Sequence, residues 1–409
     1  MSKRRFLLLQ GVASPFFARL GDKLQEQGHS VFKINFNGGD LAYWGTRSAW
    51  SYRQDIKDLP DYLNQKYSQF AITDQILFGD CRPIHQVATS CAITPGIRTH
   101  VFEEGYFRPY WVTLEQGGVN KNSRLPRCSK WFWEVGKHVP EYQDGVAFSP
   151  SFRARVVHDV CYRLAGISNP ILFSKYKTHK GVIAVVAGMA YARRFSQLLI
   201  KERQEAKKKI AKLLEEGVPY FFLPLQISDD AQITSHSSFS NMSEVILTVM
   251  TSFAKNVPAN TSLVIKNHPL DYGLTNYAAV IKKLAKELCL ENRIVYLESG
   301  DLNCLVQEAL GVITVNSTVG SFALGLGCPT IALADAIYNL PDLTFQGALD
   351  DFWGTLIKPN AQLYQRFRNT VIHTTQINGG FYSKSSIKMA VENCLTTLTQ
   401  RKTSLDLLL

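Results

Sequence analysis

Short apolar runs that alternate with helical patterns restrict the fold of this sequence more than any other feature. At the start, an apolar run at 6–10 leads into a turn at 11–14, a helical pattern that begins at Pro15, and a second apolar run at 31–35. Proline suits the first turn of a helix, and Gly28 is the kind of residue that ends one. This strand–helix–strand order predicts parallel strands covered by helices.

The same rhythm continues along both halves of the chain. In the first half, further strands are predicted at 75–79, 92–95 and 100–102, and an irregular connection at 108–150. In the second half, predicted strands span 220–225, 262–266, 294–297, 311–315 and 330–333, and predicted helices span 191–216, 242–255, 276–288, 302–309 and 317–326. Residues 346–409 are expected to be largely helical. The pattern predicts an α/β fold with two Rossmann-like domains that face a cleft.

The length agrees with this division, because 409 residues correspond to two large domains or three small ones at roughly 150 residues each. We place one Rossmann-like domain at 1–190, a second at 191–345 and a helical segment at 346–409. No apolar stretch of about 20 residues is present, so no membrane-spanning helix is expected. The basic, apolar start at 1–10 predicts a first core strand rather than a signal peptide, because its apolar run is short.

Net charge indicates the class of partner, and the cysteine pattern indicates whether metals or disulfides are expected. The 45 Lys and Arg residues exceed the 34 Asp and Glu residues, and the net charge of +11 favours an anionic partner such as a nucleotide, a phospholipid, an acidic glycan or a nucleic acid. The eight cysteines form no CxxC pair, so we interpret them as reduced, mostly buried thiols, and we expect neither a metal site nor a cofactor.

Two acidic groups follow predicted strands, where ligands gather in parallel sheets. Glu103 and Glu104 come after 100–102, and either could act as a general acid or base, or simply belong to a polar loop. Asp230 lies four residues after Gln226, just beyond 220–225, and could be a nucleophile or part of a tight turn.

Two further groups are suited to an anion. Lys266 and His268 follow a predicted strand, and Pro269 keeps His268 extended, so both side chains could donate to a phosphate. Asn316, Ser317 and Thr318 lead into a predicted helix whose free N–H groups could hold an anion. The alternatives are a structural histidine and an ordinary serine N-cap.

Together the four groups indicate a two-domain glycosyltransferase, with a nucleotide on the second domain and an acceptor on the first. One rival is a nucleic-acid-binding protein, although the basic residues are scattered outside 191–216 and no RNA-binding signature is present. Another is a non-catalytic lipid or glycan carrier.

Several motifs resemble the bacterial capsule polysaccharide β-Kdo transferases (Kdo is 3-deoxy-D-manno-octulosonic acid). They are LLLQGVASPFFARL, FNGGDLAYW, EEGYFRPYW, PLQISDDAQI, KNHP and NSTVGSFAL. The resemblance implies a GT-B enzyme of Gram-negative bacteria whose C-terminal helices cross back to the first domain. It implies transfer of Kdo from CMP-Kdo to phosphatidylglycerol or lysophosphatidylglycerol, at the cytoplasmic face of the inner membrane. The capsule extension transferase KpsC and the export machinery are the implied partners, and nucleic acid is not.

The resemblance also implies roles for single residues. Glu104, or its neighbour Glu103, matches the acid/base position, and Gln226 and Asp230 match a QxxxD motif whose aspartate is the nucleophile of a retaining mechanism. His268–Pro269 matches an HP motif that contacts the CMP phosphate. Bacterial sialyltransferases share that motif, so a CMP-sialic acid donor stays open.

Ser317 and Thr318 match the motif that clamps the CMP phosphate, which the resemblance implies as their role. The basic pattern at 191–216 has two interpretations, a helix that rests on anionic lipid or a solvated surface helix with Glu–Lys pairs.

Overall fold

The computed structural model describes residues 3–149, 151–177, 203–227, 237–269, 271 and 275–409. Contacts divide the chain into two units. The first comprises 1–125, 139–185 and 369–409, and the second comprises 126–138 and 186–368. The predicted boundary between 190 and 191 lies outside the described residues.

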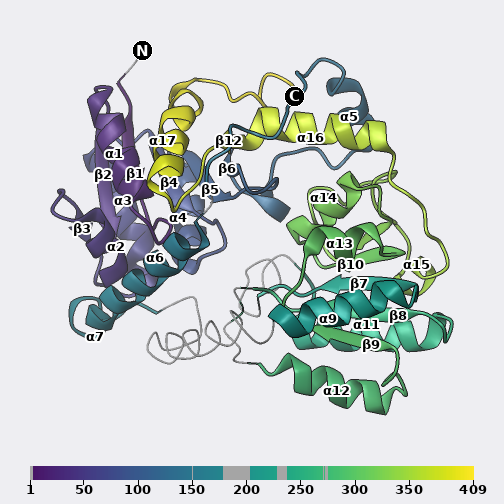
Figure 1. The fold of residues 1–409 in the computed structure, drawn as a ribbon. Helices are drawn as coiled ribbons and strands as arrows, with labels where there is room; N and C mark the ends of the chain where they lie inside the picture. Colours follow the sequence, from purple (N-terminus) through teal and green to yellow (C-terminus); the bar gives the residue numbers. More distant parts are fainter. Residues whose placement is uncertain (1–2, 150, 178–202, 228–236, 270, 272–274) are drawn as a thin grey trace. The chain divides into compact units, whose positions relative to one another are not determined.

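The first unit is built on a seven-stranded sheet in the order β12-β6-β5-β4-β1-β2-β3 (Figure 1). Its strands are β1 (Arg5–Leu8), β2 (Ser30–Asn35), β3 (Trp50–Ser51), β4 (Asp74–Phe78), β5 (Arg98–Glu104), β6 (Trp111–Gln116) and β12 (Gln376–Asn378). The five strands from β3 to β5 run parallel, whereas β6 and β12 are antiparallel to their neighbours.

Helices cover both faces of this sheet. They are α1 (Phe16–Glu26), α2 (Gly38–Trp44), α3 (Leu59–Gln69), α4 (Pro83–Ile93), α6 (Phe152–Ala165), α7 (Asn169–Leu172) and α17 (Lys384–Thr399). Phe6 and Leu8 of β1 pack in one core with α1 and α17, and Leu7 and Leu9 pack in the other with α3 and α4. Because both faces are buried, β1 is an uninterrupted apolar run rather than an alternating one.

The second unit has a five-stranded, fully parallel sheet in the order β11-β10-β7-β8-β9. Its strands are β7 (Tyr220–Pro224), β8 (Ser262–Lys266), β9 (Ile294–Leu297), β10 (Gly311–Thr314) and β11 (Thr330–Ala332). Its helices are α5 (Ser129–Val135), α9 (Arg203–Glu215), α11 (Met242–Asn256), α12 (Tyr277–Glu287), α13 (Leu302–Gln307), α14 (Thr318–Gly325) and α15 (Leu349–Phe352). The strand–helix alternation predicted for this half is confirmed.

The C-terminal part of the chain returns to the first unit. Helix α16 (Ala361–Thr375) begins in the second unit and ends in the first, β12 then joins the sheet beside β6, and α17 packs against α1 (Figure 1). The predicted α/β class and the return of C-terminal helices are therefore confirmed. A cleft between the units stays a prediction.

Two predictions about local structure were wrong. The apolar run at 92–95 is not a strand, because Ala92 faces the core from the last turn of α4 and the chain turns before Pro95. The stretch at 108–150 is not wholly irregular, since it contains β6 and α5. Strand β6 was missed because it pairs antiparallel with β5 through a short connection, whereas a strand–helix rhythm predicts only parallel strands joined by helices.

The structure also tests the predictions that the cysteines are mostly buried thiols and that no helix spans a membrane. All eight cysteines are free thiols, but only Cys328 and Cys394 are buried, so the expectation of mostly buried thiols was wrong. Among the described residues, no helix is both long enough and apolar enough to cross a bilayer. Of the basic pattern at 191–216, residues 191–202 lie outside the described residues and most of the rest forms α9, whose Lys212 pairs at 3.6 Å with Glu216, the residue after the helix.

A buried carboxylate fastens α17 to the first sheet. Asp74 begins β4 and accepts hydrogen bonds from the side chains of Arg98 at 2.7 Å and His100 at 2.8 Å, and Arg4 lies 3.4 Å away. The two arginines also donate to the last carbonyls of α17, from Arg4 to Thr399 at 3.0 Å and from Arg98 to Leu398 at 3.1 Å. They therefore cap that helix at the end where its dipole favours positive charge.

We expect Asp74→Asn to destabilise the protein by about 3–5 kcal/mol, because it leaves two largely buried guanidinium groups without their counter-charge. Asp22→Asn, which breaks the more exposed pair with Arg47, serves as the control and should cost at most about 1 kcal/mol. Denaturant unfolding followed by circular dichroism measures both. Equal losses of unfolding free energy in the two variants would contradict a special role for the buried Asp74 ion pairs.

The same carboxylate sets a pH dependence for stability. Burial raises the pKa of Asp74, but the hydrogen bond from His100 and the nearby positive charges outweigh burial and bring it from 3.8 to about 2. The stabilisation is therefore complete above about pH 4 and is lost as the pH falls toward 2.

Candidate functional site

Glu103 and Glu104 end β5 at the carboxyl edge of the first sheet and have different surroundings. The Glu104 carboxylate accepts a hydrogen bond from the Tyr382 hydroxyl at 2.8 Å and pairs with Arg155 of α6 at 3.1 Å. Its side chain is about one-fifth exposed. The Glu103 carboxylate turns back to accept the backbone N–H of Glu104 at 2.9 Å.

The surroundings of Glu104 keep its carboxylate ionised. Burial raises its pKa, but the charges of Arg155 and Arg108 and the hydrogen bond from Tyr382 outweigh burial, so the pKa lies below its usual value. A carboxyl group with a low pKa is poorly suited to donate a proton at neutral pH. Glu104 can instead act as a proton acceptor or stabilise positive charge.

A second polar cluster at this edge was not identified from the sequence. The Tyr162 hydroxyl of α6 donates to Asp40 at 2.8 Å and accepts from the side-chain amide of Asn37 at 2.9 Å. The amide nitrogen of Gln10, which follows β1, lies 3.1 Å from the same hydroxyl. Available signals were the glutamine at the end of one predicted strand and the FNGGD motif at the end of the next.

The two glycines of that motif let α6 approach. A Cβ atom at Gly38 would lie 2.3 Å from the carbonyl oxygen of Ala165, and one at Gly39 would lie 2.7 Å from the Tyr162 ring. Both distances are far below van der Waals contact, so larger residues would push α6 away. The motif therefore holds α6 against the carboxyl ends of β1 and β2, while Arg155 holds it to the end of β5.

In the second unit, Gln226 and Asn316 form a reciprocal pair at the carboxyl ends of β7 and β10. The Gln226 side chain is buried, donates to the Asn316 side-chain oxygen at 3.1 Å and accepts the Asn316 backbone N–H at 3.3 Å. The pair fixes the turn from which Ser317 and Thr318 begin α14. The structure thus brings Gln226 and the 316–318 group together.

Ser317 is the N-cap of α14, as its position before an apolar helix suggested. Its hydroxyl accepts the Val319 N–H at 3.2 Å, and the buried Tyr338 hydroxyl donates to the Ser317 carbonyl at 2.6 Å. A Cβ at Gly320 would lie 2.3 Å from the Tyr338 hydroxyl, so glycine is needed there. This half-exposed start of a helix, including Thr318, favours negative charge.

The Lys266–Pro269 group follows β8, next to β7 in the sheet. The buried Asn267 side chain accepts the His268 N–H at 2.8 Å and donates to Glu298 at 3.0 Å, which fixes the path of the chain before Pro269. Burial lowers the pKa of Lys266. Since strands β10, β7 and β8 are neighbours, these ends span about 10 Å.

Asp230, the predicted nucleophile, lies at 228–236, outside the described residues. Of the QxxxD motif, the structure describes Gln226 and Ile227 and not the three residues that follow. Among the residues that the structure describes, no group of three or more His, Cys, Asp or Glu side chains is placed to hold a metal ion.

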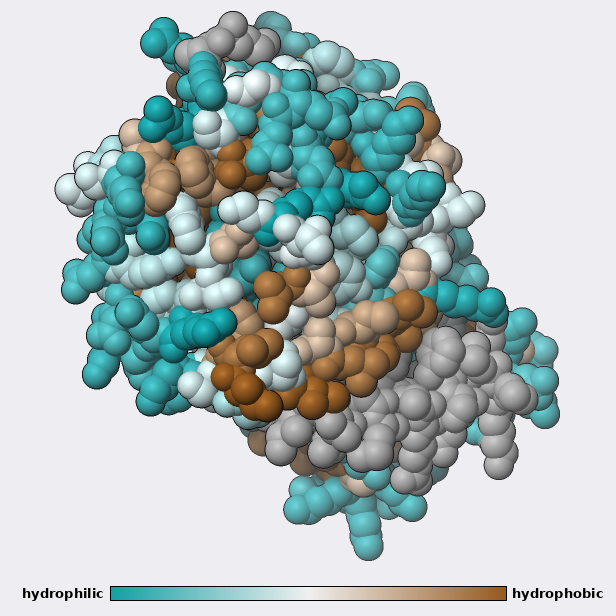
Figure 2. All heavy atoms as spheres, turned by 90° about the vertical axis from the view of Figure 1, so that its left-hand side faces the viewer, coloured by the Kyte–Doolittle hydropathy of each residue, from teal (hydrophilic) through white to brown (hydrophobic). Residues whose placement is uncertain are grey.

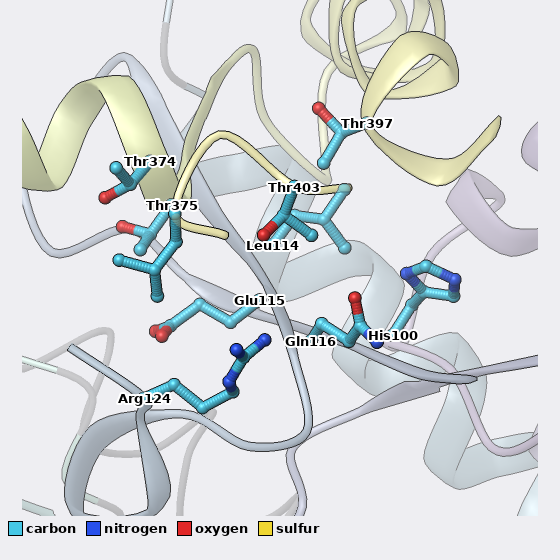
Figure 3. A pocket seen from close by; sticks show the side chains of 10 residues that line it. His100, Leu114, Glu115, Gln116, Arg124, Thr374, Thr375, Thr397 and Thr403 are labelled. Carbon is cyan, nitrogen blue, oxygen red and sulfur yellow. The ribbon is translucent and has the colours of Figure 1, made fainter. Parts of the chain in front are cut away.

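A small pocket lies at the opposite, amino-terminal end of the first sheet (Figure 3). It is lined by His100, Leu114, Glu115, Gln116, Arg124, Thr374, Thr375, Thr397, Thr403 and Leu405. Glu115 is buried and accepts a hydrogen bond from the Tyr106 hydroxyl at 2.7 Å. None of the candidate residues lines this pocket, so we regard it as structural.

These features define an α/β protein with polar and charged side chains at the carboxyl ends of the parallel strands of two sheets, where folds of this class bind ligands. The family model for capsule polysaccharide biosynthesis proteins matches residues 73–382. The chain is 35% identical over 384 residues to capsule polysaccharide export protein KpsS of Escherichia coli, covering 93% of this chain and 98% of that one. The chain therefore belongs to the capsule polysaccharide biosynthesis protein family, and the resemblance in its motifs is confirmed.

Other similar proteins have related descriptions. Capsule polysaccharide modification protein LipB of Neisseria meningitidis serogroup B is 34% identical over 392 residues, which covers 94% of this chain and 93% of LipB. Among solved structures, Thermosulfurimonas dismutans KpsC, described as a beta Kdo 2,7 transferase, has a TM-score of 0.44 at 12% identity, over 95% of this chain and 99% of that one.

We expect Arg155→Gln to raise the pKa of Glu104, because the variant removes a positive charge 3.1 Å from the carboxylate. Arg153→Gln is the matched control, since Arg153 is an exposed arginine on the same helix, and it should leave the titration unchanged. NMR titration of ¹³C-glutamate-labelled protein, assigned with Glu104→Gln, measures the pKa. An unchanged pKa in Arg155→Gln would contradict the role of the ion pair.

Proposed function

We propose that this protein is a retaining glycosyltransferase that transfers β-Kdo from CMP-Kdo to phosphatidylglycerol or lysophosphatidylglycerol. The observation that carries the proposal is the group of anion-suited residues at the adjacent ends of β7, β8 and β10. Membership of the capsule polysaccharide biosynthesis family and the motif resemblance support the choice of a CMP-sugar donor.

The second unit would hold the donor. His268 and Lys266 would donate to the CMP phosphate from the end of β8, and the start of α14 with Ser317 and Thr318 would donate from the end of β10. Gln226 and Asn316 would act mainly as positioning residues, because they hydrogen-bond to each other. These donors would stabilise the negative charge that develops on the departing CMP.

Retention of the β configuration requires two displacements. The Asp230 carboxylate would attack the anomeric carbon as CMP leaves, forming a covalent glycosyl–enzyme ester. The acceptor hydroxyl would then attack the same carbon, Glu104 would take its proton, and the Asp230 carboxylate would be released. Glu104 is the candidate base of the second step because its carboxylate lies at the carboxyl end of β5 and stays ionised, and Glu103 is the alternative base.

The biological setting follows from the acceptor. A Kdo unit on a phosphatidylglycerol lipid would start the linker on which a capsular polysaccharide is built, at the cytoplasmic face of the inner membrane. KpsC-type transferases would extend it, and the export machinery would receive the product. The family and the names of its relatives support a place in capsule assembly.

The direct test supplies the protein with CMP-Kdo and a fluorescent, short-chain phosphatidylglycerol. We expect release of CMP and one new glycolipid whose NMR spectrum has a β-Kdo linkage. CMP-sialic acid in place of CMP-Kdo distinguishes the sialyltransferase alternative, in which it would be the better donor. Acceptor binding without CMP release from either donor would contradict the proposal and favour the carrier alternative.

The nucleophile has its own test. Asp230→Asn should lower kcat by about 10³-fold or more, because an amide cannot form the glycosyl ester. Asp229→Asn is the matched control, one residue away, and should retain most of the activity. Steady-state CMP release measures both, and near-normal turnover by Asp230→Asn would exclude this role.

A further inference from the structure

Helix α6 presents its polar face to the protein. Three of its side chains, at helical spacing, point inward. Arg155 lies 3.1 Å from Glu104 and His158 lies 2.8 Å from the Tyr43 hydroxyl. Tyr162 donates to Asp40 at 2.8 Å. A surface helix of a water-soluble domain normally places its apolar face inward and its polar face in water. The orientation of α6 is the reverse.

The outer face of α6 and α7 is correspondingly apolar. An apolar stripe follows intervals of three and four residues along α6, the 3-10 turn at Gly166–Ser168 and α7. Its members are Val157, Val160, Leu164, Ile167 and Ile171. Their exposed fractions are 56%, 37%, 58%, 54% and 87%. Figure 2 shows a band of apolar side chains on this face, at the level of α6 and α7. We call these five residues the α6–α7 stripe.

Basic residues accompany the stripe. Residues 151–177 contain five Lys or Arg residues and one Asp, and that aspartate pairs with Arg163 at 2.7 Å. Arg153, Lys175 and Lys177, at the two ends of the stripe, are exposed. Apolar side chains with cations beside them match an anionic lipid surface, in which the apolar groups enter the acyl boundary and the cations contact the headgroups.

We propose that the α6–α7 stripe is the surface by which this protein docks on an anionic bilayer. The inward residue Arg155 connects the docking helix to Glu104, so the carboxyl edge of the first sheet would lie beside the lipid surface. The inference rests on the proposed function only for its purpose, the delivery of a lipid acceptor. Its evidence is the exposed stripe and the charges at its ends.

Vesicle binding by the full chain tests the proposal. The probes are phosphatidylcholine vesicles with and without 30 mol% (about one-third) phosphatidylglycerol, and sedimentation measures the bound fraction. Leu164→Gln/Ile171→Gln should weaken binding to anionic vesicles by about 20-fold or more. Lys175→Ser/Lys177→Ser should weaken it by about 5-fold or more, and added salt should reduce that difference.

The control is Leu247→Gln/Ile357→Gln, which replaces apolar residues of similar exposure, 47% and 63%, in the second unit and should bind as the parent does. Parent-like vesicle binding by Leu164→Gln/Ile171→Gln would overturn the proposal. Light scattering measures self-association. The proposal would also be overturned if the parent self-associates and Leu164→Gln/Ile171→Gln abolishes this self-association but still binds vesicles.

Transfer to a water-soluble, short-chain acceptor separates this proposal from the proposed function. The stripe variant should retain that activity and lose transfer to acceptor embedded in vesicles. If the parent lacks transferase activity but binds vesicles through the stripe, the proposed function fails and the docking surface stands. If activity is present in the parent but vesicle binding does not depend on the stripe, the docking proposal fails alone.

Discussion

The buried ion pairs of Asp74 hold the first unit together, because they join three parts of the chain that are distant in sequence. Arg4 directly precedes β1, Asp74 and Arg98 begin the neighbouring strands β4 and β5, and the two arginines also bind the last carbonyls of α17. A charged side chain buried without a partner costs several kcal/mol, so the three charges require one another. The end of the C-terminal helix is thereby fixed to the amino-terminal edge of the sheet, opposite the edge that carries Glu104.

At the carboxyl edge of the first sheet, the contacts that α6 makes with the candidate site determine which of its faces is exposed. Its inward polar side chains contact Glu104, Asp40 and the residues around them, and the small residues Gly38 and Gly39 allow the approach. With its polar face used in this way, its apolar side chains are left outside. A helix that supports the candidate base is therefore also the one that presents an apolar surface.

Prediction from sequence succeeded where one local pattern was enough. The strand at 262–266 was placed correctly because an apolar run bounded by turn residues has one stable position in a parallel sheet. It failed for 92–95, where a short apolar run fits a buried helix end as well as a strand. It missed β12, because three residues acquire strand geometry only by pairing with β6. The partner of Glu104 was missed because Arg155 lies 51 positions away in sequence.

The sequence by itself determined the α/β class, the strand ends that carry Glu104, Gln226, His268 and Ser317, and the family, because periodicity and motifs are local properties of the chain. Only the tertiary structure decided which groups meet. It paired Gln226 with Asn316, it set the ionisation of Glu104, and it turned the apolar face of α6 outward. Each of these depends on which distant segment lies within a few ångströms, and distances between segments arise only when the chain folds.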